Sequence, residues 1–277
     1  AVQVAAALPR LPELRSLRLT GNALGTPGAE ALVPGLAAAG GLLELDLAEN
    51  GLGAAGVEAL IKANLRLQAL CLRRSWIGSD RTRVLPQLLC PMGATLRKLD
   101  LAENKIGAEG MHALVEDLPP LPELLALDLS LNRFATTAFA TAPFWRLAEA
   151  TPALEELNLF GCGVGEDEAA TRAVGRGLSA SLRSLFLGAA DLKPPRLVQL
   201  LDALPTLPSL ECLGLVQSRL DDKAAAALAA EAPLAKLPRL QLLDITGNLV
   251  GRAAGLRLQA ALKSSAAFRQ LRGVRHR

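Results

Sequence analysis

Leucines recur along the chain in an eleven-residue pattern. Positions one, four and six carry leucine or isoleucine, position nine carries a small polar residue, and position eleven is aliphatic or aromatic. Successive copies start 25 to 30 residues apart, and a spacing of this kind is typical of stacked repeats. Nine copies are complete, and they start at Leu14, Leu42, Leu67, Leu96, Leu124, Leu154, Leu182, Leu210 and Leu240, before a truncated tenth at Phe268.

Each repeat combines two hydrophobic periods. Leu17 and Leu19 alternate with polar residues, which is the two-residue period of a strand. In the segments that start at Gly28, Gly56 and Gly110, apolar residues return every fourth position, as they do in a helix. Prolines precede many of the next strands and end these helices, because proline lacks a backbone donor. The sequence therefore predicts a strand, a turn, a helix and a return loop in each repeat.

These motifs resemble the ribonuclease-inhibitor-like leucine-rich repeats, over roughly residues 8 to 274. The resemblance implies an α/β solenoid shaped like a horseshoe, with a parallel sheet on the concave face and helices on the convex face. It implies a single domain over residues 1–277, with about nine full repeats and a partial repeat at each end. It also implies a polar ladder of Asn22, Asn50, Asn104, Asn132 and Asn248, with Ser75, Cys162 and Ser218 as substitutes. At Ala190 the turn must satisfy its backbone in another way.

The two ends lack the polar capping repeats that solenoids use to cover their terminal cores. Residues 1–9 are predicted to be the tail of a helix whose own strand is missing, and the last repeat stops just after its strand. We therefore expect that the chain is a segment of a larger protein, or that another subunit covers its ends.

Composition limits the classes of partner and the cellular compartment that we expect for this chain. The longest stretches without charged residues, Ala31–Leu43 and Val84–Leu96, are too short for a membrane helix, so we expect no membrane insertion. The net charge of +3 is small for 277 residues and argues against a nucleic-acid partner. The basic residues near the end, from Arg269 to Arg277, are interpreted as a solvated terminus. Four widely spaced cysteines predict free thiols, and we expect an intracellular, reducing compartment, either the cytoplasm or an organelle reached after removal of a targeting segment.

No enzyme motif is present in the sequence. It has neither a phosphate-binding loop nor a dinucleotide-binding glycine pattern. Neither His112 nor His276 has a set of Cys, His or carboxylate residues near it at the spacing of metal ligands. We therefore expect no catalytic activity, no cofactor and no metal. Ran-type GTPase-activating proteins share this repeat and carry an arginine in a loop beyond a strand. Arg74 could be placed in that way, but the residues around it match no motif of that family.

The residues that flank the core leucines are expected to point outward on the concave sheet, as in the triplet Glu44, Asp46 and Ala48. Repeats two to five are polar and partly acidic there, and their aspartates are interpreted first as generic sheet residues, since the family commonly carries Asp at this position. Three groups are candidates for partner binding. They are the acidic pair Asp100 and Asp128, an apolar patch of Phe160, Phe186 and Val216 in one outward column, and the cluster Arg73, Arg74 and Trp76.

The pattern as a whole predicts a protein–protein interaction module, a scaffold or structural subunit of a larger assembly that binds partners through its concave face or its uncapped ends. One alternative is the ligand-sensing repeat region of a NOD-like receptor. The other is a Ran-type GTPase-activating protein, which would accelerate GTP hydrolysis.

Overall fold

The strands form one parallel sheet in which each pairs with the strand of the next repeat. The computed structural model describes residues 1–136, 139, 143–264 and 267–273. The ten strands in these ranges follow one another in sequence order. They are β1 (Ser16–Arg18), β2 (Glu44–Asp46), β3 (Ala69–Cys71), β4 (Lys98–Asp100), β5 (Ala126–Asp128), β6 (Glu156–Asn158), β7 (Ser184–Phe186), β8 (Cys212–Gly214), β9 (Leu242–Asp244) and β10 (Gln270–Arg272). The predicted parallel solenoid is confirmed, and the truncated tenth repeat contributes β10.

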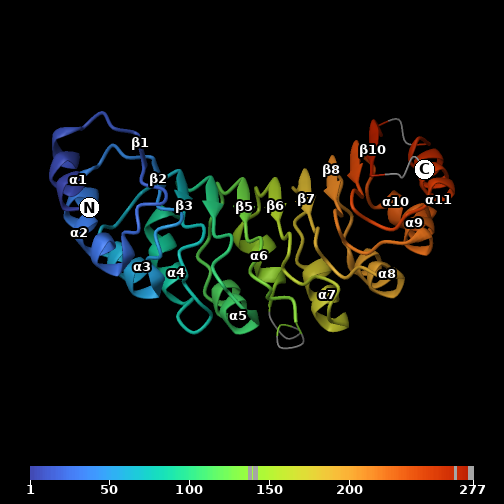
Figure 1. The fold of residues 1–277 in the computed structure, drawn as a ribbon. Coiled ribbons are helices and arrows are strands. Elements are labelled where there is room, and N and C mark those ends of the chain that lie inside the picture. Colours follow the sequence, from blue (N-terminus) through green and yellow to red (C-terminus); the bar gives the residue numbers. More distant parts are fainter. Residues whose placement is uncertain (137–138, 140–142, 265–266, 274–277) are drawn as a thin grey trace.

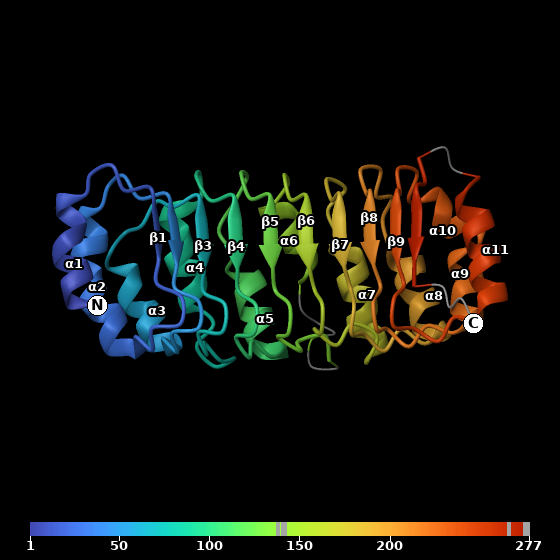
Figure 2. The same cartoon turned by 45° about the horizontal axis from the view of Figure 1, so that its top comes forward.

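The helices cover the outer face of the sheet. Figure 1 shows the arc from the side, with the strands along its inner edge, and Figure 2 shows the strands in one row in front of the helices. The α-helices are α1 (Val2–Ala7), α2 (Gly25–Ala38), α3 (Gly53–Ile61), α4 (Val84–Leu89), α5 (Ala108–Glu116), α6 (Trp145–Ala150), α7 (Glu168–Arg176), α8 (Pro194–Ala203), α9 (Asp222–Leu228), α10 (Glu231–Ala235) and α11 (Arg252–Leu262). Two 3₁₀ helices, η1 (Leu8–Arg10) and η2 (Cys90–Met92), continue α1 and α4. The residues at the start of the chain are therefore helical, as predicted.

The core lies between the sheet and the helices. The central leucines of adjacent strands are register partners, as Leu45, Leu70 and Leu99 show, and all three are buried. The neighbouring positions Glu44 and Asp46 face the concave side, so the predicted strand register is correct. The third position of the outward triplet differs in several repeats. Ala48, Ala102 and Ser130 are buried, because they lie just beyond the strands, where the chain turns.

Buried asparagines connect the turns of neighbouring repeats. The Asn50 side-chain amide donates to the carbonyls of Leu19 (2.7 Å) and Leu47 (3.0 Å). Its oxygen accepts from the amide of Asn22 (2.9 Å). The predicted substitutes fill the ladder only in part. The Cys162 thiol donates to the Leu129 carbonyl (3.1 Å), whereas the buried Ser75 hydroxyl has no hydrogen-bond partner.

The turn around Ala190 uses backbone bonds instead. The amide of Ala189 donates to the Val216 carbonyl (2.8 Å), and the amide of Leu192 donates to the Ser218 carbonyl (3.1 Å). This is the alternative that the missing polar side chain required.

Three phenylalanines fill the middle of the solenoid behind β5. The ring centroids of Phe134 and Phe139 are 5.1 Å apart, and that of Phe144 lies 6.0 and 5.5 Å from them. All three side chains are buried. Packed rings therefore fill the core of the repeat whose helix, α6, has six residues.

Two expectations concern other parts of the chain. Arg275, His276 and Arg277 of the basic terminus lie outside the described residues. In the described ranges, no helix is long and apolar enough to cross a bilayer.

Candidate functional site

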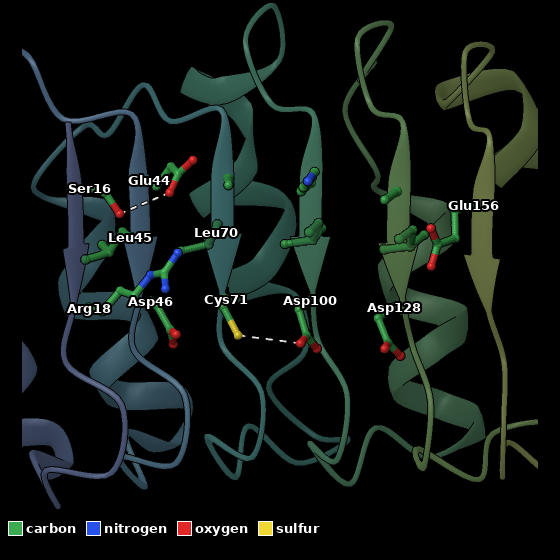
Figure 3. Close-up of a pocket in the computed structure, with 15 residues that line it drawn as sticks. Ser16, Arg18, Glu44, Leu45, Asp46, Leu70, Cys71, Asp100, Asp128 and Glu156 are labelled. Carbon is green, nitrogen blue, oxygen red and sulfur yellow. Dashed lines mark hydrogen bonds between the residues drawn. The ribbon is translucent and has the colours of Figure 1, made fainter.

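A shallow hollow lies on the concave face of the first six repeats. Its volume is about 390 Å³. We call it the concave groove. Figure 3 shows its side chains projecting from successive strands. It is lined by Ser16, Arg18, Glu44, Leu45, Asp46, Ala69, Leu70, Cys71, Lys98, Leu99, Asp100, Ala126, Leu127, Asp128 and Glu156.

One column of the groove is acidic because of the strand register. Asp46 pairs with Cys71, Cys71 with Asp100, and Asp100 with Asp128. These four side chains lie in a row across the strands in Figure 3. Strands in a sheet are about 4.8 Å apart, so neighbouring carboxylates in this row repel one another.

Each aspartate of the row also has a local role. One carboxylate oxygen accepts from the amide two residues further on, at 2.9 Å in Asp46 and Asp100 and 2.8 Å in Asp128. The side-chain oxygen of Asn158 accepts from Phe160 in the same way at 3.0 Å. This backbone bond explains the recurrence of Asp and Asn at this position. It does not require a negative charge, since Asn158 provides it without one.

The groove as a whole carries more acidic than basic groups. Its lining includes the carboxylates of Glu44, Asp46, Asp100, Asp128 and Glu156 against the cations of Arg18 and Lys98. The Ser16 hydroxyl donates to Glu44 at 3.0 Å, and no ion pair within the described residues joins the two cations to these acids. The groove therefore presents a negative potential to solvent.

Burial affects two acidic groups of this row. Burial raises the pKa of the Cys71 thiol to about 12, and the carboxylates of Asp100 and Asp46 add to the rise. Burial also raises the pKa of Asp100, opposed by its bond from the Ala102 amide and reinforced by Asp128. Among the described residues, no group of three or more His, Cys, Asp or Glu side chains is arranged to hold a metal ion.

Comparisons with known proteins agree with this architecture. The sequence model of the family described as Leucine Rich repeat matches residues 11–33, 42–60 and 94–115. Ribonuclease inhibitor from Sus scrofa is 31% identical over 252 residues, which cover 88% of this chain and 49% of the relative. The chain is a leucine-rich repeat protein of the ribonuclease-inhibitor-like type. It spans about half the length of this curated relative.

Two solved structures share the leucine-rich repeat fold. The protein LegL7 from Legionella pneumophila has a TM-score of 0.63 and 19% identity, over 98% of this chain and 85% of its own. A chain from the complex of Rad7 and Elc1 in yeast has a TM-score of 0.55 and 21% identity, over 90% of this chain and 67% of its own. At these identities the likeness establishes the fold.

The predicted apolar column of Phe160, Phe186 and Val216 is wrong for Phe186. Phe186 pairs with Asn158 and Gly214, so it lies in the aspartate row, whereas Phe160 lies two residues beyond Asn158. A Cβ placed on Gly188 would lie 2.6 Å from the Phe160 ring, and one on Gly214 would lie 2.8 Å from the Phe186 ring. Each ring therefore lies over a glycine of the next repeat.

This packing changes the interpretation of the patch. Phe160, Phe186 and Val216 are each half-buried, and the two rings cover the backbone at separate places. Phe160 and Val216 do flank Gly188 in one row, as predicted, but Phe186 does not join them. The signal was available in the sequence, because a glycine stands at the position in the next repeat that each ring covers.

The other two candidate groups are where the sequence placed them. Asp100 and Asp128 lie side by side in the concave groove. Arg73 is half-buried and forms an ion pair with Glu103. Arg74 and Trp76 are exposed in the turn after β3, and Trp76 points outward with 62% of its surface exposed. They therefore belong to the edge of the horseshoe and not to the groove.

The sequence analysis missed two features. It did not single out Glu44 and Glu156, which add their charges to the groove from another column. It also missed Lys105, whose ammonium lies 5.4 Å from the centre of the Trp76 ring. Both features depend on which side chains of adjacent repeats lie next to each other, and the motif of a single repeat does not show this.

Proposed function

We propose that this chain is a protein–protein interaction module, a scaffold or structural subunit of a larger assembly, and that its concave groove takes a basic surface of a protein partner. The observation that carries the proposal is the row of Asp46, Asp100 and Asp128 in a hollow with five carboxylates and two cations. The relative's name, ribonuclease inhibitor, supports binding of another protein. The similar yeast chain was crystallised in the complex of Rad7 and Elc1, which is a further case of a chain with this fold in an assembly.

The groove suits a protein surface better than a small molecule. It is open and extends across six strands, whereas small ligands are usually enclosed in deeper clefts. Complementary charge across an interface raises the association rate and selects the partner. A partner with lysines or arginines at the spacing of the strands would place them opposite successive carboxylates.

Removing the charge of the row tests this directly. In the triple variant Asp46→Asn, Asp100→Asn and Asp128→Asn, each amide oxygen still accepts the backbone bond, as Asn158 does. We expect the Kd for the partner to rise about tenfold at physiological salt, which corresponds to about 1.4 kcal/mol. The thermal melting temperature should stay within about 2 °C of wild type, because the backbone bonds remain and the loss of carboxylate repulsion offsets the loss of the bond from Asn158 to Asp128 (3.0 Å). The partner is first captured by a photo-cross-linking residue at Ala126, in the groove.

A matched variant removes the same number of charges from the helices. Glu30→Gln, Glu58→Gln and Glu109→Gln alter exposed residues of α2, α3 and α5. This variant should bind like wild type, and a cross-linker at Glu58 should not capture the partner. Equal weakening by both triple variants would show a non-specific charge effect. Unchanged binding by the groove variant would place the partner on another surface.

We further propose that the chain works in a reducing compartment inside the cell. Support comes from the four thiols, which are dispersed and unpaired: Cys71 and Cys212 are on β3 and β8, and Cys90 is exposed on η2. Strands five apart in the sheet are about 24 Å apart, far beyond disulfide reach.

Thiol reactivity should follow burial. The reactive form is the thiolate, and burial raises the pKa of Cys71 and of Cys162 to about 12, so both stay protonated at pH 8. We expect a thiol reagent to modify Cys90 rapidly in the folded protein and Cys71 and Cys162 only slowly. Mass spectrometry of labelled peptides measures this order. In denaturant without reductant all four should react, and fewer than four would reveal a disulfide.

A further inference from the structure

A rim of left-handed turn residues runs along the edge of the solenoid, beside the ends of the strands. One rim residue precedes the ladder position in each of the nine full repeats, and a second follows it in all of them except repeats seven and nine. Three successive repeats carry a side chain at both positions with φ between +43° and +60°. They are Arg74, Trp76, Glu103, Lys105, Leu131 and Arg133. We call these six residues the central rim.

The backbone at these positions favours glycine. Repeats elsewhere place glycine there, as in Gly51, Gly161 and Gly163, whose φ values are +58°, +68° and +81°. A side chain in the left-handed region costs conformational free energy that glycine does not. Strained residues of this kind persist where the side chain has another use. The equivalent pair in repeat eight, Gln217 and Arg219, also has side chains, so the central rim needs additional evidence.

That evidence is exposed apolar surface among cations. Trp76 and Leu131 are 62% and 43% exposed, and Lys105 lies over the Trp76 ring. On the side of the earlier repeats, Trp76 and Arg74 form one wall of a hollow of about 470 Å³. Its other lining residues are small or polar, namely Ala23, Gly25, Glu49, Asn50 and Gly51. Trp76 therefore presents apolar surface to this hollow.

Two of the three cations of the central rim have no ion-pair partner among the described residues. In the described part of the chain, no carboxylate lies within ion-pair distance of Arg74 or Lys105. Arg133 is paired with Glu166 at 3.0 Å. Two free cations therefore flank an exposed tryptophan, and a ligand that supplies carboxylates and a flat apolar group complements them.

We propose that the central rim is a second docking surface, for a short acidic segment of a protein partner that packs an aromatic or proline side chain against Trp76. It lies outside the concave groove, has the opposite charge and goes beyond the function proposed above. A nucleic acid fits less well, because Glu49 and Glu103 interrupt the cations and the acidic groove lies alongside. A peptide segment needs only the length of about three repeats.

A displayed library of random 12-residue peptides provides the test. It is selected on the wild-type chain and counter-selected on the Arg74→Glu, Lys105→Glu double variant. The expected result is enrichment of peptides rich in Asp and Glu that contain an aromatic residue or proline. A synthetic copy of the best peptide should bind at least tenfold more weakly to Trp76→Ala and to the double variant. Enrichment of neutral or basic peptides, or of none, would overturn the proposal.

Fluorescence locates the bound peptide. Trp76 and Trp145 are the two tryptophans, so a Trp145→Phe chain reports on Trp76 alone. A peptide without tryptophan should shift the Trp76 emission to shorter wavelength as the ring is covered. If a twelve-nucleotide oligothymidine binds there more tightly than the best peptide, the partner is a nucleic acid and the proposal is wrong.

Two controls separate binding from folding. The Gln217→Glu, Arg219→Glu variant makes a similar change at the equivalent left-handed positions of repeat eight and should bind the peptide normally. Trp76→Gly should abolish binding and raise the melting temperature, because it relieves the left-handed backbone. A lower melting temperature would show that Trp76 serves the fold. The groove variant Asp46→Asn, Asp100→Asn, Asp128→Asn should retain rim binding, so the two proposals fail independently.

Discussion

Phe134→Ala is expected to lower the free energy of unfolding by about 3–5 kcal/mol, the range for removing a buried phenylalanine ring. The Phe134 ring has no exposed surface, and its centroid lies 5.1 Å from that of Phe139 and 6.0 Å from that of Phe144. Alanine would leave a cavity beside the two remaining rings. The loss includes the cost of this cavity, because the surrounding side chains relax only partially.

The consequence should extend beyond one repeat. Each repeat of a solenoid contacts only its neighbours, so a weak central interface divides the array into two parts. Urea unfolding followed by circular dichroism should show one transition in wild type and two in Phe134→Ala. Hydrogen exchange should show that repeats next to β5 open first. Phe134→Leu, which keeps most of the volume, should cost less than about 1.5 kcal/mol. An equal loss in both variants would contradict the cavity explanation.

The fold could be predicted from the sequence because its main determinants are periodic. Leu17 and Leu19 recur in each repeat and point into the core, so the residues between and beside them face the concave side. A shift of the strand register by one residue would expose every one of these leucines. The same spacing predicts the acidic pair Asp100 and Asp128, since register partners in a parallel sheet lie side by side.

The prediction of the apolar patch was wrong because it assigned Phe186 to the wrong row of the sheet. Phe186 is the second outward residue of its repeat, whereas Phe160 and Val216 are the third of theirs, and the sheet keeps those rows apart. The rim could not be predicted for a different reason. The direction of Trp76 and Lys105 depends on left-handed backbone in the turns, which hydrophobic periodicity does not specify.

Conformation also decides how well each substitute serves the ladder. Ser75 was expected to replace asparagine, and its amide does donate to the Asn104 side chain at 2.9 Å. Its hydroxyl has no partner, whereas the Ser218 hydroxyl donates to the Val216 carbonyl at 3.2 Å. Cys162 reaches the Leu129 carbonyl at 3.1 Å. The fold therefore tolerates a ladder residue whose side chain is not hydrogen-bonded. The contribution of a fully bonded asparagine can then be measured by substitution.

Asn132→Ala should be the most damaging change in that ladder, at about 3 kcal/mol. The buried Asn132 amide donates to the carbonyls of Leu101 (2.9 Å) and Leu129 (2.8 Å). Its oxygen accepts from the amides of Asn104 (2.9 Å) and Ile106 (3.1 Å). Each buried group left without a partner costs about 1–3 kcal/mol, and partial relaxation or a water molecule would recover some of the total.

Asn22→Ala is the matched control at the exposed end of the same ladder. Its side-chain amide donates to the carbonyls of Leu19 (2.8 Å) and Thr20 (3.2 Å), where water can replace it, so the expected loss is below about 1 kcal/mol. Urea unfolding of both variants measures the difference. Asn132→Ser should lie between them, because Ser75 already shows that a serine at this position leaves part of the ladder unbonded. If both alanine variants lost equal stability, the buried bonds between turns would contribute no more than the exposed ones. The horseshoe would then depend on its leucines alone.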